Sequence, residues 1–151
     1  LRLSRLEVEN ICDEASTRIG RATTMRGGKD ATIIACGLMV HQALKAAEEL
    51  AKQNIDVRVL NMNTIKPIDR ESIIRAAKET GCIVTAEDHN IIGGLGGAVA
   101  EVIAEECPVK MARVGVRDSF GKSGDPAALM EKYGLTSKNI VEAVKSLLES
   151  K

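Results

Sequence analysis

The chain has 151 residues, and its 21 basic and 21 acidic side chains cancel. A neutral chain without a long run of one charge lacks the electrostatic footprint of a nucleic-acid binder or a membrane-surface protein. Phe120 and Tyr133 are the only aromatic residues, which excludes base stacking and aromatic ligand cages and predicts an aliphatic core. The length predicts a single domain.

The cysteines predict a reduced protein without a zinc site. The four cysteines, Cys12, Cys36, Cys82 and Cys107, form no C-x-x-C pair. The chain has only two histidines that could complete a metal site. The sequence shows neither a signal peptide nor an apolar run of the roughly 20 residues that a membrane span needs. We therefore expect a cytoplasmic protein, and the first residue, Leu1, suggests a fragment or a processed piece.

The first half of the domain predicts three strands and two helices. Residues 18–25 are β-leaning but carry a glycine and two arginines, which favours an edge strand. Residues 31–36 form an apolar run typical of a buried strand, and apolar residues at helical spacing follow to about residue 53. Residues 56–62 predict the next strand. Asp69 is placed to cap a second helix, which Gly81 ends.

The second half continues the same alternation. Residues 82–86 predict a buried strand, followed by a polar turn at 87–90, a glycine-rich loop at 93–97 and a helix that stops near residue 107. Residues 109–116 predict the last strand, and 117–124 form a polar loop. Two helices close the chain, one begun by Asp125 with Pro126 and ended by Gly134, the other capped by Thr136.

Alternating strands and helices predict a three-layer α/β/α domain. Parallel strands joined by right-handed crossovers place helices on both faces of the sheet. We expect about five strands in a mixed, mostly parallel sheet, with the first strand antiparallel at an edge.

Glu87, Asp88 and His89 form the one dense cluster of titratable groups at a predicted strand end. Such a cluster can supply a general base or an ion site, and the carboxyl ends of parallel strands are where ligands usually bind. No nucleophile or second histidine lies near it in the sequence. The alternative is a solvated, partly hydrogen-bonded turn.

Gly93, Gly94, Gly96 and Gly97 allow two interpretations. A dinucleotide-binding loop would require a third glycine at position 99, which is Val99. Glycines that let a helix start close to a strand end explain the loop by packing, and an anion or partner contact at the helix start is the alternative.

Two further matches to cofactor motifs fail. The G-K-S at 121–123 lacks the first glycine of a phosphate-binding loop, because Val116 stands in its place. Gly124-Asp125 begins like a thiamine diphosphate motif, but Pro126 replaces the second glycine that this motif needs. The residues alone therefore indicate an α/β domain with an incomplete site.

Four segments, in order, closely resemble the C-terminal domain of transketolase. They are KDATIIACG at 29–37, RVLNMNTIKPID at 58–69, VTAEDHNIIGGLGG at 84–97 and FGKSGDPAALMEKYGL at 120–135. The resemblance runs from about residue 18 to the end. We expect residues 18–151 to be this domain and residues 1–17 to be a flank, either a linker or the end of a pyrimidine-binding domain.

The resemblance implies a five-stranded mixed sheet and a role in an enzyme that moves two-carbon ketol units between sugar phosphates. Its cofactors, thiamine diphosphate and magnesium, are held in this family by two other domains, so this domain is expected to bind neither cofactor nor metal and to contribute no catalytic residue. It implies an assembly role beside the thiamine-binding domains or subunit of the same enzyme, within a homo-oligomer such as a dimer. Deoxyxylulose phosphate synthase, a relative, and an autonomous small-molecule-binding module are the alternatives.

The resemblance also suggests site residues. Leu3-Ser4-Arg5 is similar to a segment whose arginine contacts the substrate phosphate, although the family continues S-R-Q where this chain has S-R-L. Arg5 is the candidate phosphate contact in the intact enzyme, and the alternative is an isolated charge on the flank. The other candidates, for an interface or an anion, are Glu87, Asp88, His89, Gly93, Gly94, Gly96 and Gly97.

Overall fold

A computed structural model describes residues 10–11 and 17–150 of the chain. Five strands form one sheet: β1 (Thr23–Arg26), β2 (Ala31–Ala35), β3 (Val57–Asn61), β4 (Cys82–Asn90) and β5 (Lys110–Val116). Their order across the sheet is β1-β3-β2-β4-β5. β1 is antiparallel to β3 and the other neighbouring pairs are parallel, which confirms the predicted mixed sheet with its first strand antiparallel at an edge.

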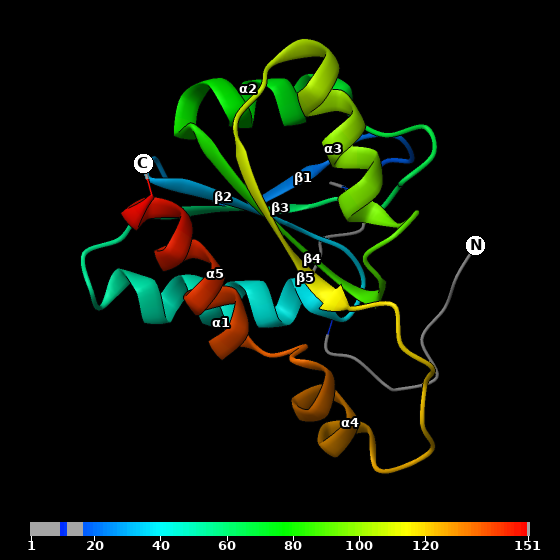
Figure 1. Cartoon of the computed structure of the whole chain (residues 1–151). Coiled ribbons are helices and arrows are strands. Elements are labelled where there is room, and N and C mark those ends of the chain that lie inside the picture. The colour runs from blue at the N-terminus through cyan, green and yellow to red at the C-terminus, as the bar shows by residue number, and fades with distance from the viewer. Residues whose placement is uncertain (1–9, 12–16, 151) are drawn as a thin grey trace.

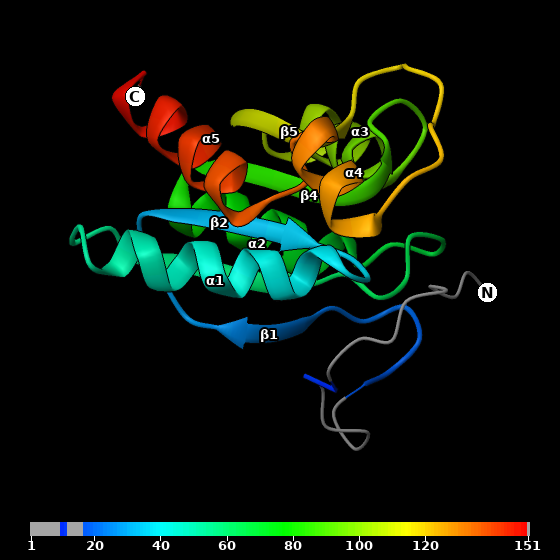
Figure 2. The ribbon, with the colours of Figure 1, turned by 90° about the horizontal axis from the view of Figure 1, so that it is seen from below.

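Two pairs of helices cover the sheet. α1 (Met39–Ala51) and α5 (Ser137–Glu149) lie on one face, and α2 (Arg70–Thr80) and α3 (Leu95–Glu106) lie on the other, as Figure 1 shows. Seen from below, β1 lies at one side of this sandwich and β5 at the other (Figure 2). α4 (Pro126–Tyr133) has no fully buried residue, and its Met130 and Tyr133 pack against the core that α1 and α5 cover (Figure 1).

Each face of the sheet carries its own apolar core. The odd-numbered residues of β2, such as Ile33, pack with α1 and α5, whereas Ile34 packs with α2 and α3. This alternation follows from the period of two along a strand. All five residues of β2 are buried because helices cover both faces of this central strand.

The predicted helix ends are confirmed at four positions by their hydrogen bonds or backbone angles. Asp69 accepts a hydrogen bond from the Ser72 backbone N–H at 3.1 Å and begins α2. Asp125 accepts from Ala128 N–H at 3.0 Å and begins α4. Gly81 and Gly134 end these helices with φ of 71° and 68°, in the left-handed region that favours glycine.

Two boundaries around the glycine-rich segment were predicted wrongly. The polar residues 87–90 are the second half of strand β4, which continues past an irregularity until Asn90 pairs with Val116. Helix α3 begins at Leu95, so Gly96 and Gly97 belong to its first turn. The polar Glu87 is accommodated inside the strand because its carboxylate accepts hydrogen bonds from backbone N–H groups at the start of α3.

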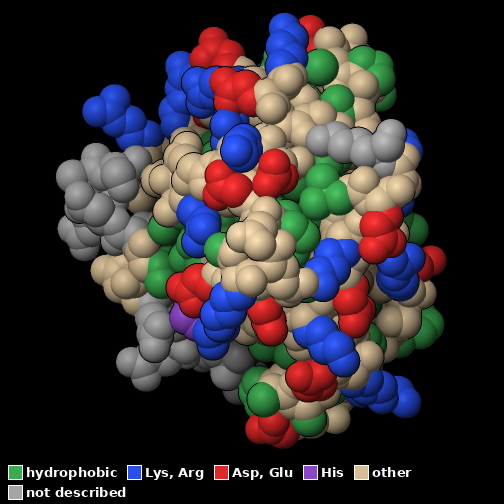
Figure 3. Space-filling view, turned by 90° about the vertical axis from the view of Figure 1, so that its left-hand side faces the viewer, with side chains coloured by type: hydrophobic (Ala, Val, Ile, Leu, Met, Phe, Trp, Pro, Cys, Tyr) green, Lys and Arg blue, Asp and Glu red, His purple; other side chains and the backbone are tan. Residues whose placement is uncertain are grey.

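The surface carries both charge signs. Figure 3 shows acidic and basic side chains interspersed over one face of the molecule. Among the described residues, no helix is both long enough and apolar enough to cross a membrane.

Candidate functional site

The carboxyl ends of β2, β3, β4 and β5 meet at one edge of the sheet, and the antiparallel β1 begins there. We call this region the carboxyl edge. It consists of the segments 17–22, 36–38, 62–69, 91–94 and 117–125, which precede β1 or follow the other strands. In open α/β sheets, this is the edge where ligands and partners most often bind.

Glu87 is a buried carboxylate that caps α3 from a neighbouring strand. It is 2% exposed, and its two oxygens accept hydrogen bonds from the backbone N–H groups of Leu95 and Gly96, both at 2.8 Å. The residue in the ordinary capping position is Gly94, which has no side chain to accept them. A negative carboxylate at a helix start is also favoured by the helix dipole. Glu87 is thus engaged inside the domain, where it cannot touch a large partner directly.

Two of the glycines make room for this arrangement. A Cβ atom built on Gly94 would overlap the Glu87 carboxylate. One built on Gly96 would lie 2.8 Å from Cδ of Arg113 and 3.0 Å from Oγ1 of Thr85. These contacts account for Gly94 and Gly96 by packing alone.

Gly93 and Gly97 differ from these two glycines. A Cβ on either would meet no atom within 4 Å. Gly93 is exposed and has a φ of 75°, so a turn conformation requires this glycine, and its surface is open to a partner.

Asp88 and His89 point to different surroundings from Glu87. Asp88 is half-buried beside the end of β2, where a Cβ on Gly37 would lie 3.9 Å from its Oδ1. His89 is exposed, and its Nδ1 accepts a hydrogen bond from the Asn90 backbone N–H at 2.6 Å. Alternate side chains leave a strand in opposite directions, which separates Asp88 from Glu87, and His89 differs from Glu87 because it is exposed near the end of the strand.

Asn90 joins two loops of the carboxyl edge. Its side-chain oxygen accepts from Ile92 N–H at 2.8 Å, and its amide nitrogen donates to Asp118 at 3.3 Å. Arg113 on β5 adds a hydrogen bond to the Ile91 carbonyl at 3.1 Å. The loops after β4 and β5 are thus held together, which sequence reasoning did not find because the partners are 22 to 28 residues apart.

The exposed large hydrophobic residues of the described chain all lie at this edge. They are Ile19 at 90%, Ile65 at 39%, Ile92 at 63% and Phe120 at 98% exposure. Phe120 lies in a run of exposed residues from 117 to 128. Side chains of this kind gathered in loops at one edge are typical of a surface that another protein part covers.

Asp69 fixes the segment before β1 to this edge. Its side chain accepts hydrogen bonds from Ala22 N–H at 2.9 Å and from the Ser72 hydroxyl at 2.9 Å. Burial by itself raises the pKa of this carboxyl. The hydrogen bonds from Ala22 and Ser72 and the charge of Arg21 outweigh burial, so the pKa of Asp69 lies below its ordinary value.

The described residues show no metal site, and they do not include the residue predicted to contact the substrate phosphate. No group of three His, Cys, Asp or Glu side chains in residues 10–11 and 17–150 could hold a metal ion. Arg5 lies outside the described residues, as does most of the flank predicted at 1–17.

Comparison with known proteins gives consistent matches. The protein family described as transketolase, C-terminal domain, matches residues 20–140. A 6-deoxy-6-sulfo-D-fructose transketolase subunit from Clostridium sp. (strain MSTE9) is 51% identical over 147 residues, which are 97% of this chain and 44% of that protein. A 1-deoxy-D-xylulose-5-phosphate synthase from Heliobacterium modesticaldum is 40% identical over 135 residues, 87% of this chain and 21% of that protein.

A solved structure is also similar. It is described as a split gene transketolase, an inactive β4 tetramer, and matches with a TM-score of 0.92 and 47% identity over 96% of this chain. The match covers 48% of that protein's chain. This chain therefore spans less than half the length of each relative named here.

Proposed function

This chain belongs to the transketolase C-terminal domain family, and from that premise we propose that it serves a transketolase as an assembly domain. In the intact enzyme, two-carbon ketol units pass between sugar phosphates, with thiamine diphosphate and magnesium bound by other domains or by a partner subunit. The domain comprises residues 18–151, and residues 1–17 form the flank that leads to the rest of the enzyme.

Two observations at the carboxyl edge support this proposal. Its buried acid, Glu87, is already hydrogen-bonded within the domain, and its loops expose large apolar side chains. Glu87, the buried acid of the strand-end cluster, is bound to two backbone N–H groups of α3. Gly124-Asp125-Pro126, the partial thiamine motif, starts helix α4, with the Asp125 side chain on Ala128 N–H. We therefore assign the binding of thiamine diphosphate and the ketol-transfer reaction to another domain or subunit of the enzyme.

The carboxyl edge is the proposed contact with a neighbouring domain or protomer. Phe120 and Ile92 would supply apolar area, and His89, Asp88 and Gly93 would supply polar and backbone contacts beside them. Burying a phenylalanine side chain stabilises a contact by about 1.5–3 kcal/mol. Interfaces of this kind combine an apolar centre with a polar rim.

A calorimetric titration tests the absence of cofactor binding. The chain is titrated with thiamine diphosphate in the presence of magnesium, and no heat of binding is expected. Saturable binding at micromolar concentration that excess inorganic phosphate does not displace would refute the proposal, because an assembly domain has no site for the cofactor as a whole.

A variant tests the proposed contact. Phe120→Asp should leave the melting temperature of the chain unchanged, because this side chain is 98% exposed. It should weaken association with the thiamine-binding part of the same enzyme by about 10-fold or more. Ser146→Asp, on the exposed side of α5, introduces the same charge and is the control. Equal association of both variants with the partner, measured by sedimentation, would rule out Phe120 as a contact.

The alternatives from the sequence give different results. An autonomous small-molecule module would raise its melting temperature with a tight ligand, whereas an assembly domain gives no shift with nucleotides. The transketolase subunit matches at 51% identity and the deoxyxylulose phosphate synthase at 40%, which favours the transketolase interpretation. We further propose that the enzyme is cytoplasmic and acts in pentose phosphate metabolism. We also propose that it forms a homo-oligomer such as a dimer.

A further inference from the structure

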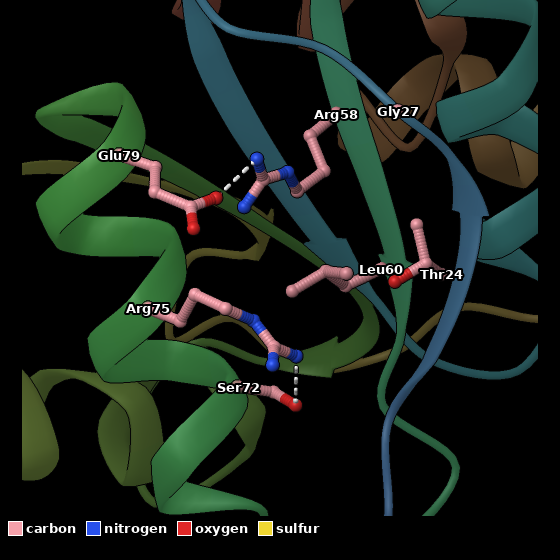
Figure 4. A pocket seen from close by; sticks show the side chains of 7 residues that line it. All are labelled: Thr24, Gly27, Arg58, Leu60, Ser72, Arg75 and Glu79. Carbon is pink, nitrogen blue, oxygen red and sulfur yellow. Dashed lines mark hydrogen bonds and ion pairs between the residues drawn. The ribbon is translucent and has the colours of Figure 1, made fainter.

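A hollow of about 250 Å³ lies between β1, β3 and α2 (Figure 4). It is on the β1 side of the sheet, whereas Ile92 and Phe120 follow β4 and β5 on the other side. Seven residues line it: Thr24, Gly27, Arg58, Leu60, Ser72, Arg75 and Glu79. Leu60 provides an apolar floor, and the other side chains are polar or charged. The hollow is thus a polar site built from three elements that the sheet topology brings together.

Two guanidinium groups line the hollow with one carboxylate. Arg58, whose side chain is 16% exposed, pairs with Glu79 at 2.5 Å. Arg75, one helical turn before Glu79, has no carboxylate within ion-pair distance in the described part of the chain, and its Nη2 donates to the Ser72 hydroxyl at 3.3 Å. One positive charge of the lining therefore remains uncompensated.

Arg58 has further donors to offer. A guanidinium carries five N–H groups, and Glu79 is the one partner of Arg58 among the described residues. Figure 4 shows Arg58 and Arg75 entering the hollow from opposite walls, β3 and α2. Forked donors from two sides match the oxygens of a phosphate group, and such charge-assisted hydrogen bonds are the strong ones.

We propose that this hollow binds the phosphate group of a small metabolite between Arg58 and Arg75. The hydroxyl of Thr24 lies on the same lining as a further donor, and Glu79 can accept a hydrogen bond from a sugar hydroxyl. No aromatic side chain lines the hollow, so a nucleotide base finds no stacking surface there. The ligand class is therefore a sugar phosphate or inorganic phosphate.

The competing explanation is purely structural. In that case the Arg58–Glu79 pair closes the sheet edge over Leu60, and Arg75 is an ordinary exposed cation. The two explanations differ in one measurable respect, since a binding site must respond to phosphate at constant ionic strength, whereas exposed cations respond only through screening.

NMR spectroscopy of the arginine side chains tests the proposal. The Nε–Hε signals of Arg58 and Arg75 are followed as inorganic phosphate or ribose 5-phosphate replaces chloride at fixed ionic strength, with ribose as the uncharged control. We expect saturable shifts of both signals with either phosphate compound and none with ribose. Because the two signals belong to residues that line the hollow, they distinguish phosphate bound there from phosphate bound elsewhere on the chain.

Matched variants complete the test. Arg75→Gln removes an exposed cation that lines the hollow, and Lys78→Gln removes a cation from the same helix outside it. We expect phosphate binding to weaken about 10-fold or more in Arg75→Gln and to remain within twofold in Lys78→Gln. Shifts that do not saturate, or an equal loss of binding in both variants, would overturn the proposal. Neither outcome bears on the assembly role, which is tested at Phe120, a residue that does not line the hollow.

Discussion

Replacing Glu87 tests whether a carboxylate from a strand stabilises the start of α3. In Glu87→Gln, one carboxylate oxygen becomes an NH₂ group, which cannot accept a hydrogen bond. One of the two backbone N–H groups, that of Leu95 or Gly96, then loses its acceptor inside the protein. Gly94, at the capping position, has no side chain to replace it.

The expected cost follows from this geometry. Hydrogen bonds to charged groups contribute about 1.5–3 kcal/mol, and an unsatisfied buried N–H costs a similar amount. The favourable interaction of the negative charge with the helix dipole is lost as well, so we expect a decrease of about 2–4 kcal/mol in the free energy of unfolding. For a domain of this size, this corresponds to a melting temperature about 4–16 °C lower.

Urea unfolding followed by circular dichroism measures the change, with Glu101→Gln as the control. Glu101 lies on the exposed side of α3, and its substitution should change stability by less than about 0.5 kcal/mol. Hydrogen exchange at the amides of Leu95 and Gly96 should accelerate in Glu87→Gln alone. If Glu87→Gln unfolds at the same urea concentration as the control, the carboxylate does not hold the helix.

Three further predictions follow from single contacts. Gly28→Ala should destabilise the domain by about 1–3 kcal/mol, because its Cβ would overlap the backbone of the Val57–Arg58 segment, whereas Gly27→Ala, whose Cβ meets no atom, should be nearly neutral in thermal unfolding. The lowered pKa of Asp69 means that its contribution to stability is complete above about pH 4 and is lost as the pH falls through its folded-state value, so Asp69→Asn should flatten the loss of stability in acid. Equal acid sensitivity of this variant and the parent would contradict the assignment. Phe120→Asp should unfold like the parent but associate more weakly with the partner, and a lower melting temperature would show that Phe120 packs within the domain.

Local rules predicted most of the fold. Strand–helix alternation indicated the layers, and the caps at Asp69, Asp125 and Thr136 were readable because each acceptor lies within three residues of its donor. The glycines at 81 and 134 marked helix ends for an equally local reason, their left-handed backbone.

Contacts between distant residues were not predictable in the same way. Glu87 was assigned to a polar turn because a strand of apolar residues becomes polar there, and its donors, eight and nine residues further along, belong to another element. Likewise, nothing in the sequence pairs Arg58 with Glu79 or places Arg75 beside them. Such sites depend on tertiary structure, so periodicity and spacing do not reveal them.

The central claim is that this domain assists assembly and leaves the chemistry to the rest of the enzyme. Ketol transfer is measured with the purified chain in the presence of thiamine diphosphate and magnesium, and then with the thiamine-binding part of the same enzyme added. We predict no turnover by the chain alone and turnover when both parts are combined. Sugar phosphate conversion by the chain alone would contradict the claim.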